Sequence, residues 1–194
     1  MNVEVLAVGT ELLLGQIVNG NAADIGQRLA EVGLDHYRQT VVGDNLDRVT
    51  AAIREAAARS DALIITGGIG PTQDDLTREA MRDAAGVAME FSDEYAEHLR
   101  EWWGRRGREM PATNLRQAEY PTGAMLIPND KGTAPGLRLR IGGCWVFALP
   151  GVPEEMLPMV DAHVVPFLVA EAGAGAGVIV SRILRTWGES ESRI

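Results

Sequence analysis

The sequence predicts an α/β fold: three layers around a doubly wound, mostly parallel sheet, with a β-hairpin in the second half. Three observations predict it. Short apolar segments alternate with helical patterns through the first half of the chain. A glycine-rich turn joins one of these segments to a helical pattern, and Gly142-Gly143 lies between two apolar segments, which is typical of a hairpin. The chain has 194 residues, enough for one full domain with a substantial core.

The first half of the chain supplies the alternating elements. The helical segments carry apolar side chains at a spacing that places them on one face, and Gly33 follows the first of them as a helix-ending glycine. The second strand is more polar than the others. The predicted strands are residues 3–8, 35–42 and 62–66, and the predicted helices are residues 21–32, 46–58 and about 73–85.

The second half alternates less regularly. Residues 92–105 have a helical pattern whose stripe of Tyr95, Leu99 and Trp102 we interpret as core or subunit contact. Three further strands are predicted, the last two joined by the glycine turn, and a closing helix follows despite Pro158 and Pro166. These elements are residues 124–127, 137–141, 144–149 and 156–170.

The chain divides into a folded domain and the start of another. Residues 1–170 are expected to form the domain. Residues 171–178 are a low-complexity Gly/Ala segment, which we interpret as a flexible linker. Residues 178–186 have a strand pattern that cannot bury itself alone, so residues 179–194 are expected to begin a truncated second module.

Composition excludes several classes of function. The net charge is −9 and no basic block could follow a nucleic-acid backbone, so nucleic acid is not expected as the main partner. No apolar run approaches the roughly 20 residues of a membrane span. The chain has one cysteine, Cys144 in an apolar strand, which cannot form an internal disulfide and favours a cytoplasmic location.

The glycine-rich turn is the strongest candidate for a ligand site. Gly67, Gly68 and Gly70 would let the backbone approach an anion closely. Asp74 and Asp75 follow, and carboxylates beside a phosphate site imply a divalent cation.

Two structural interpretations compete with a metal role. Thr72 and Asp75 have the spacing of a capping box, in which both side chains satisfy backbone amides. Asp74 could also pair with Arg78, one helical turn away.

Other polar residues follow strands of the same sheet and would reach the same edge. Asp44 follows the second strand, although its local sequence favours a helix N-cap. Lys131, in a glycine-containing loop, is a candidate charge for a phosphate or an ordinary exposed lysine. Thr10, Glu11, Asn21, Gly151 and Val152 complete the candidates at this edge.

Several common catalytic motifs are absent from the sequence. It has no Gly-x-Ser-x-Gly nucleophile motif, no P-loop ending and no dinucleotide fingerprint. The three histidines are scattered without metal-ligand spacing, and we interpret them as surface or core residues.

Four motifs in order carry a specific resemblance. They are Val-Gly-Thr-Glu-Leu-Leu-Leu-Gly at residues 8–15, the glycine loop with Leu-Thr-Arg-Glu-Ala at residues 67–80, Asn-Asp-Lys-Gly-Thr-Ala-Pro-Gly at residues 129–136, and Leu-Pro-Gly-Val-Pro at residues 149–153. Together they resemble the N-terminal domain of the CinA family (competence/damage-inducible protein A), over about residues 1–170.

The resemblance implies a molybdopterin-binding-like fold, similar to the MogA and MoaB proteins, and a metal-dependent ADP-ribose pyrophosphatase activity. It also implies that residues 179–194 begin a KH-like module. Many family members add a nicotinamide-nucleotide amidohydrolase domain, which this chain lacks. Asp75 matches the aspartate at the magnesium site of related pterin adenylyltransferases, and Asp44 matches their other acidic position. Asp74 stands where those relatives often have arginine, which favours hydrolysis over adenylyl transfer.

The sequence therefore predicts hydrolysis of ADP-ribose or a related nucleotide diphosphate to AMP and ribose 5-phosphate. Asp75 and Asp44 are the predicted catalytic residues, and Asp44, Asp74 and Asp75 the predicted ligands of Mg²⁺, Mn²⁺ or Co²⁺. Two alternatives remain: a molybdopterin- or nucleotide-binding or adenylyl-transfer domain, and a non-catalytic dimerisation domain. We also expect a homodimer. The predicted substrate-binding residues are Thr10, Glu11, Asn21, Gly67, Gly68, Gly70, Pro71, Thr72, Lys131, Gly132, Thr133, Gly151 and Val152.

Overall fold

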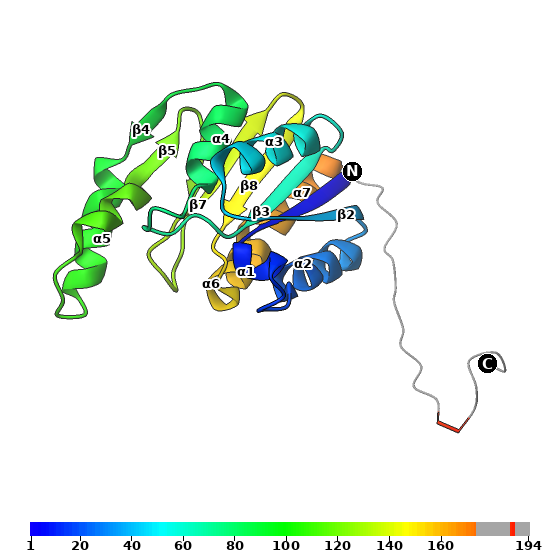
Figure 1. Cartoon of the computed structure of the whole chain (residues 1–194), viewed down its shortest axis with the longest axis horizontal. Helices are drawn as coiled ribbons and strands as arrows, with labels where there is room; N and C mark the ends of the chain where they lie inside the picture. Colours follow the sequence, from blue (N-terminus) through cyan, green and yellow to red (C-terminus); the bar gives the residue numbers. More distant parts are fainter. Residues whose placement is uncertain (174–186, 189–194) are drawn as a thin grey trace.

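Figure 1 shows a computed structural model of the chain, which describes residues 1–173 and 187–188. The predicted strand at 178–186 and the predicted module at 179–194 lie outside the described residues, apart from residues 187–188. Most of the predicted linker, residues 171–178, also lies outside them. Its first two positions are helical, because the last helix, α7, spans Val165–Ala172.

The core of the molecule is a six-stranded sheet with the strand order β2-β1-β3-β8-β7-β6. Four neighbouring strands are parallel, and β7 pairs antiparallel with both β8 and β6. This arrangement confirms the predicted fold class and the predicted hairpin. The strands are β1 (Asn2–Val8), β2 (Asp35–Val42), β3 (Ala62–Thr66), β6 (Met125–Ile127), β7 (Gly136–Ile141) and β8 (Cys144–Leu149).

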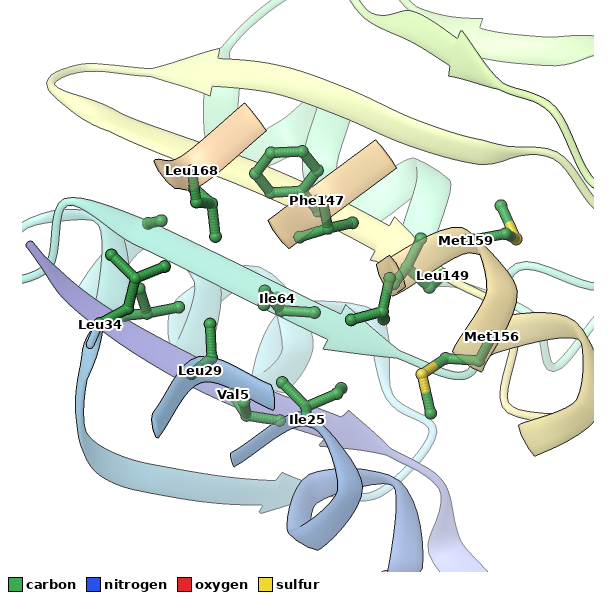
Figure 2. Packing of buried hydrophobic residues seen from close by; sticks show 14 of the residues in the cluster. Val5, Ile25, Leu29, Leu34, Ile64, Phe147, Leu149, Met156, Met159 and Leu168 are labelled. Carbon is green, nitrogen blue, oxygen red and sulfur yellow. The ribbon is translucent and has the colours of Figure 1, made fainter. Parts of the chain in front are cut away.

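Helices cover both faces of the sheet, giving the three predicted layers (Figure 1). On one face, α2 (Gly20–Glu31), α6 (Pro153–Met159) and α7 pack against alternate strand residues, and Figure 2 shows their aliphatic, Met and Phe side chains meeting. On the other face, α3 (Leu46–Ala57) and α4 (Thr77–Ala85) enclose a second cluster. Burial of these two apolar faces stabilises the sheet between its helices.

The predicted helix boundaries needed three corrections. The cap of α3 is Asn45, whose side chain accepts a hydrogen bond from the Arg48 amide at 3.1 Å, so the interpretation of Asp44 as the N-cap is wrong. The helix predicted from about residue 73 begins at Thr77. The closing helix begins earlier than predicted, at Pro153, and passes through a π-helical turn, η2 (Val160–Val164), before α7.

A small extension beside the sheet was only partly predicted. It comprises α5 (Asp93–Gly104), the 3₁₀ helix η1 (Ala112–Ala118) and an antiparallel pair, β4 (Met89–Phe91) with β5 (Glu119–Pro121). Ser92 caps α5, and Leu99 of the predicted stripe is fully buried, which confirms a core role for that residue. The strands β4 and β5 and the short helix α1 (Thr10–Leu13) were not predicted. Among the described residues, none of the helices has the length and apolar character needed to cross a bilayer.

Cys144 is expected to be unreactive in the native protein. Its side chain is fully buried in β8, and this burial raises the pKa of the thiol to about 11. The protonated thiol is therefore retained on folding, so this group's contribution to stability is lost only as the pH rises from about 9 towards 11. At pH 8 a thiol reagent should label the unfolded chain within minutes and leave the folded chain unlabelled. Rapid labelling of the folded chain would contradict this burial.

Candidate functional site

Four parallel strands end at the same edge of the sheet, and their following turns meet there. The ends are held together by backbone bonds: the Gly9 amide donates to the Val42 carbonyl at 3.0 Å, and the Gly67 amide donates to the Leu149 carbonyl at 3.0 Å. The chain crosses to opposite sides of the sheet between β1 and β3, which creates a crevice at their carboxyl ends. This is the topological position at which open α/β sheets bind ligands.

A cleft of about 710 Å³ occupies this position. It collects residues from the ends of β1, β2, β3 and β8 and from the loop after β6. Most predicted site residues lie in its wall: Glu11, Asn21, Asp44, Gly67, Gly68, Gly70, Pro71, Asp74, Asp75, Thr133, Gly151 and Val152. The structure does not bring Thr10, Thr72, Lys131 or Gly132 into that wall.

The glycine loop needs glycine for steric reasons. Gly67 and Gly68 have φ values of +95° and +68°, in the region that side-chain-bearing residues rarely adopt. A Cβ atom on Gly67 would collide with the Val8 carbonyl oxygen, and one on Gly68 would collide with the Thr77 hydroxyl. The loop therefore passes directly over the end of β1, with its backbone facing the cleft.

Two arginines fix the glycine loop by donating hydrogen bonds to its backbone carbonyls. Arg78 is almost completely buried and donates to the carbonyls of Ile69 and, at 2.7 Å, Gly70. Burial lowers the pKa of its guanidinium. The predicted Asp74–Arg78 pair is therefore wrong, because Arg78 points into the loop. Arg116 donates to the Thr72 carbonyl, and sequence pattern gave no signal for it.

Threonine side chains orient two of the candidate carboxylates. Asp75 Oδ2 accepts hydrogen bonds from the Thr72 amide at 2.8 Å and the Thr72 hydroxyl at 2.6 Å. Asp44 Oδ2 accepts in the same way from the amide and hydroxyl of Thr10, both at 2.8 Å. The capping-box interpretation is thus half right: the Thr72–Asp75 bonds form, but in a turn that precedes α4. Each carboxylate keeps its Oδ1 atom for a ligand.

Asp74 is the least constrained of the three aspartates. It lines the cleft, and within residues 1–173 its carboxylate accepts no hydrogen bond. Although all three aspartates line one cleft, no group of three or more His, Cys, Asp or Glu side chains in the described part of the chain is close enough to hold a metal ion. Protein ligands alone do not form a metal cage in this structure.

The charged side chains of the cleft wall are all acidic. Six carboxylates line it, and none of the lining residues in the described ranges is lysine, arginine or histidine. Two of these acids, Asp24 and Glu155, were missed from the sequence; each lies in the first turns of a helix, α2 and α6. Both are partly buried, and the carboxylate of Asp24 accepts no hydrogen bond from the described residues. The six are Glu11, Asp24, Asp44, Asp74, Asp75 and Glu155.

The loop after β6 is organised around Asn129. Its buried side-chain amide donates to the Ala134 carbonyl at 2.8 Å and to Glu155 Oε2 at 2.7 Å. Its oxygen accepts from the amides of Lys131 and Gly132 at 3.1 and 2.9 Å. These four bonds direct Thr133 towards the cleft, leave Lys131 exposed and press Gly132 against Glu155.

Comparison with known proteins identifies the family. The model of a family described as "Probable molybdopterin binding domain" matches residues 4–170. A solved structure of the protein CinA, of unknown function, from Thermoplasma acidophilum is 37% identical, covers 83% of this chain and 94% of that one, and superimposes with a TM-score of 0.77. The chain belongs to the CinA family.

Full-length relatives extend beyond this CinA chain. A CinA-like protein from Frankia casuarinae is 50% identical over all of this chain and 46% of the relative, and one from Nostoc sp. is 46% identical over the same shares. The chain thus spans about half the length of the curated relatives it matches. A molybdopterin biosynthesis protein from Mycobacterium abscessus, 19% identical with a TM-score of 0.58 over 88% of this chain and 92% of that one, shares the fold of this CinA domain.

Proposed function

We propose that the cleft hydrolyses the pyrophosphate bond of ADP-ribose or a related nucleotide diphosphate, with the help of a divalent cation. The observation that carries the proposal is the combination of a glycine loop with six lining carboxylates and no lining cationic side chain among the described residues. A wall of this charge repels a pyrophosphate unless cations reverse the local field.

The glycine loop supplies the groups that would hold the phosphates. The amides of Gly68, Ile69 and Gly70 make no hydrogen bond to any described residue, whereas the Gly67 and Thr72 amides are already used. Free amides on a close backbone stabilise phosphate oxygens without a side-chain charge. Thr77 binds the carbonyls of Gly67 and Gly68, and the buried Arg78 binds the carbonyl of Ile69. These three carbonyls belong to the same peptides as the free amides, so the amides need not reorganise when the ligand binds.

The carboxylate oxygens of the cleft suit a divalent cation that binds together with the substrate phosphates. Mg²⁺ is commonly held by one or two carboxylates together with substrate phosphates, and needs no all-protein cage. One or two of the carboxylates of Asp74, Asp44 and Asp75 would hold it together with the substrate phosphates, those of Asp44 and Asp75 through Oδ1. When bound there, a divalent cation neutralises phosphate charge and acidifies water.

The reaction consumes one water molecule. The water oxygen attacks one phosphorus atom, the bond from that phosphorus to the bridging oxygen breaks, and AMP and ribose 5-phosphate leave. In this scheme one of Asp75 and Asp44, the one whose Oδ1 atom does not hold the cation, orients the water and accepts its proton, which then passes to the leaving phosphate. Amides of the glycine loop stabilise the negative charge that develops on the phosphoryl oxygens. Lys131 stays a predicted contact for a phosphate, reached only if its exposed side chain turns towards the ligand.

Metal removal tests the proposal directly. The purified chain, given ADP-ribose and Mg²⁺, is expected to release AMP, and excess chelator should reduce the rate by about 100-fold or more because the acidic wall then repels the substrate. Added Mg²⁺ or Mn²⁺ should restore it. Separation of products by chromatography measures both steps. AMP release that continues unchanged in chelator, or none with any of Mg²⁺, Mn²⁺ and Co²⁺, would refute the proposal.

A second candidate is pterin or nucleotide binding without hydrolysis. The matching family model and the shared fold with molybdopterin biosynthesis proteins favour it. It predicts that the chain binds a pterin phosphate in the same cleft, and that ADP-ribose remains intact. Equilibrium binding of a pterin phosphate with and without ATP, measured beside the ADP-ribose assay, separates the two candidates.

A further inference from the structure

The extension formed by α5, η1, β4 and β5 contacts two of the loops that form the cleft. Arg116 of η1 donates to the carbonyl of Thr72 and, at 3.4 Å, to that of Asp75, in the turn that precedes α4. The hydroxyl of Tyr95 in α5 donates to the Thr133 carbonyl at 3.2 Å, in the loop after β6. These bonds fix η1 beside the segment that carries Asp75.

One side chain of η1, Gln117, lies in the cleft wall itself. Gln117 is 1% exposed, and its Oε1 atom accepts a hydrogen bond at 3.1 Å from the side-chain amide of Asn114, which is 5% exposed. The Nε2 atom of Gln117 makes no hydrogen bond to any residue in 1–173, and protein atoms do not enclose it completely. Because Gln117 lines the cleft, this NH₂ group faces the cleft with both of its protons unused.

An NH₂ group in this position suits a ligand better than it suits the fold. A donor left unpaired on a buried side chain costs free energy, so such a group in a native protein calls for a functional explanation. Asn114 occupies the oxygen of the Gln117 amide, so the cleft receives only the donor end. A donor of this kind binds a charged oxygen more strongly than a neutral one. Because Arg116 ties η1 to the turn that carries Asp75, the NH₂ group lies at the end of the cleft formed by the glycine loop.

We infer that Gln117 is a further substrate-binding residue, contributed to the cleft by the extension. Its Nε2 atom donates to a phosphate oxygen of the bound diphosphate, and Asn114 is the positioning residue that holds the amide in this orientation. The inference rests on the proposed function for the place of the phosphates. A neutral amide can bind a phosphate without repelling the cation that the acidic wall attracts.

The test measures diphosphate binding separately from hydrolysis. Calorimetry with the 194-residue chain and Mg²⁺ would use methylenediphosphonate, whose carbon bridge cannot be hydrolysed. Gln117→Met removes the donor at similar side-chain length and is expected to weaken binding by about tenfold or more, because a hydrogen bond to a charged oxygen is lost. Gln117→Glu, measured at pH 8, keeps an oxygen for the Asn114 amide and is expected to lose at least as much affinity. This second variant decides the question if Gln117→Met does not fold.

Gln16→Met provides a matched control. Gln16 is exposed and lies outside the cleft wall, so the same substitution there should leave the affinity for methylenediphosphonate within about twofold of the original chain. Urea midpoints of all the variants show whether each one is folded.

The positioning role of Asn114 is tested by coupling. Asn114→Ala releases the Gln117 amide, which can then turn its oxygen towards the cleft, and is expected to weaken binding by about threefold. In the Gln117→Met background the same substitution should cause no further loss, because Asn114 acts only through Gln117. Equal losses in both backgrounds would mean that Asn114 supports the fold and does not position Gln117.

Three results would overturn the inference for Gln117. They are unchanged affinity in a folded Gln117 variant, an equal loss in Gln16→Met, and no binding of methylenediphosphonate by the original chain with Mg²⁺. The hydrolysis proposal is judged by AMP release from ADP-ribose and can fail independently. A selective loss of binding in the Gln117 variants of a chain that releases no AMP would refute hydrolysis and keep Gln117 as a phosphate-binding residue.

Discussion

Replacing Asp75 with asparagine is expected to lower the turnover of ADP-ribose by about 100-fold or more while leaving the fold intact. The fold should survive because the asparagine oxygen can still accept the hydrogen bonds from the amide and hydroxyl of Thr72. Turnover should fall because the charge of the remaining oxygen, which would face the cation and the water, is lost. Rates of AMP release at saturating Mg²⁺, with circular dichroism of both proteins, measure the two effects.

A matched substitution separates the site from the overall charge. Asp93→Asn removes the same charge at an exposed position in the first turn of α5, outside the cleft wall. It should leave turnover within about twofold of the original. If Asp75→Asn hydrolyses ADP-ribose as fast as the original chain, Asp75 holds neither a cation nor the water, and the catalytic assignment is wrong.

Gly67→Ala is expected to destabilise the protein by about 3 kcal/mol or more. The substituted residue would have to keep a φ of +95° and place its Cβ atom against the Val8 carbonyl oxygen at the end of β1. Relief of that collision would move the whole glycine loop, so affinity for a phosphate ligand should fall as well. Urea denaturation gives the change in stability.

Gly104→Ala serves as the control for a glycine substitution. Gly104 ends α5, a Cβ atom there meets nothing within 4 Å, and its backbone is not in the left-handed region. Alanine favours the helix by up to about 1 kcal/mol, so this variant should be as stable as the original or more so. Equal urea midpoints for Gly67→Ala and the original chain would mean that the loop is not pinned over β1.

Sequence pattern was sufficient to predict the main strands of the sheet. The strands that end at Thr66 and Leu149 are almost entirely apolar, and the strand that ends at Val8 is apolar apart from Asn2 and Glu4. Helices cover both faces of these strands, so side chains on both faces are buried. The glycine loop was readable because its conformation admits no other residue. The order of the elements predicted that the glycine loop lies at the carboxyl edge of the sheet. It also predicted that Asp44, Asp74 and Asp75 lie near one another, and all three line one cleft.

Sequence pattern did not predict the tertiary contacts of the site. Arg78 has the spacing of an exposed helical residue, yet it is buried because the carbonyls of the preceding loop need a donor. Thr72 and Asp75 carry the signature of a helix start, and their bonds form, but Thr77 is tied to the carbonyls of Gly67 and Gly68 and delays the helix. Asp24 and Glu155 reach the cleft through packing of α2 and α6. The homodimer stays a prediction.

The place of β8 in the sheet has a consequence during synthesis on the ribosome. This strand is made after most of the domain, yet it pairs with β3 near the middle of the sheet, and residue 151 closes the cleft by accepting a bond from residue 21. Until residues 144–149 emerge, β3 is left with one open edge, although all five of its residues are buried in the finished protein. While residues 1–143 of this domain are being made, the nascent chain therefore carries a strand with an unpaired edge and an incomplete cleft, and it gains the protected sheet and the ligand site together once β8 emerges.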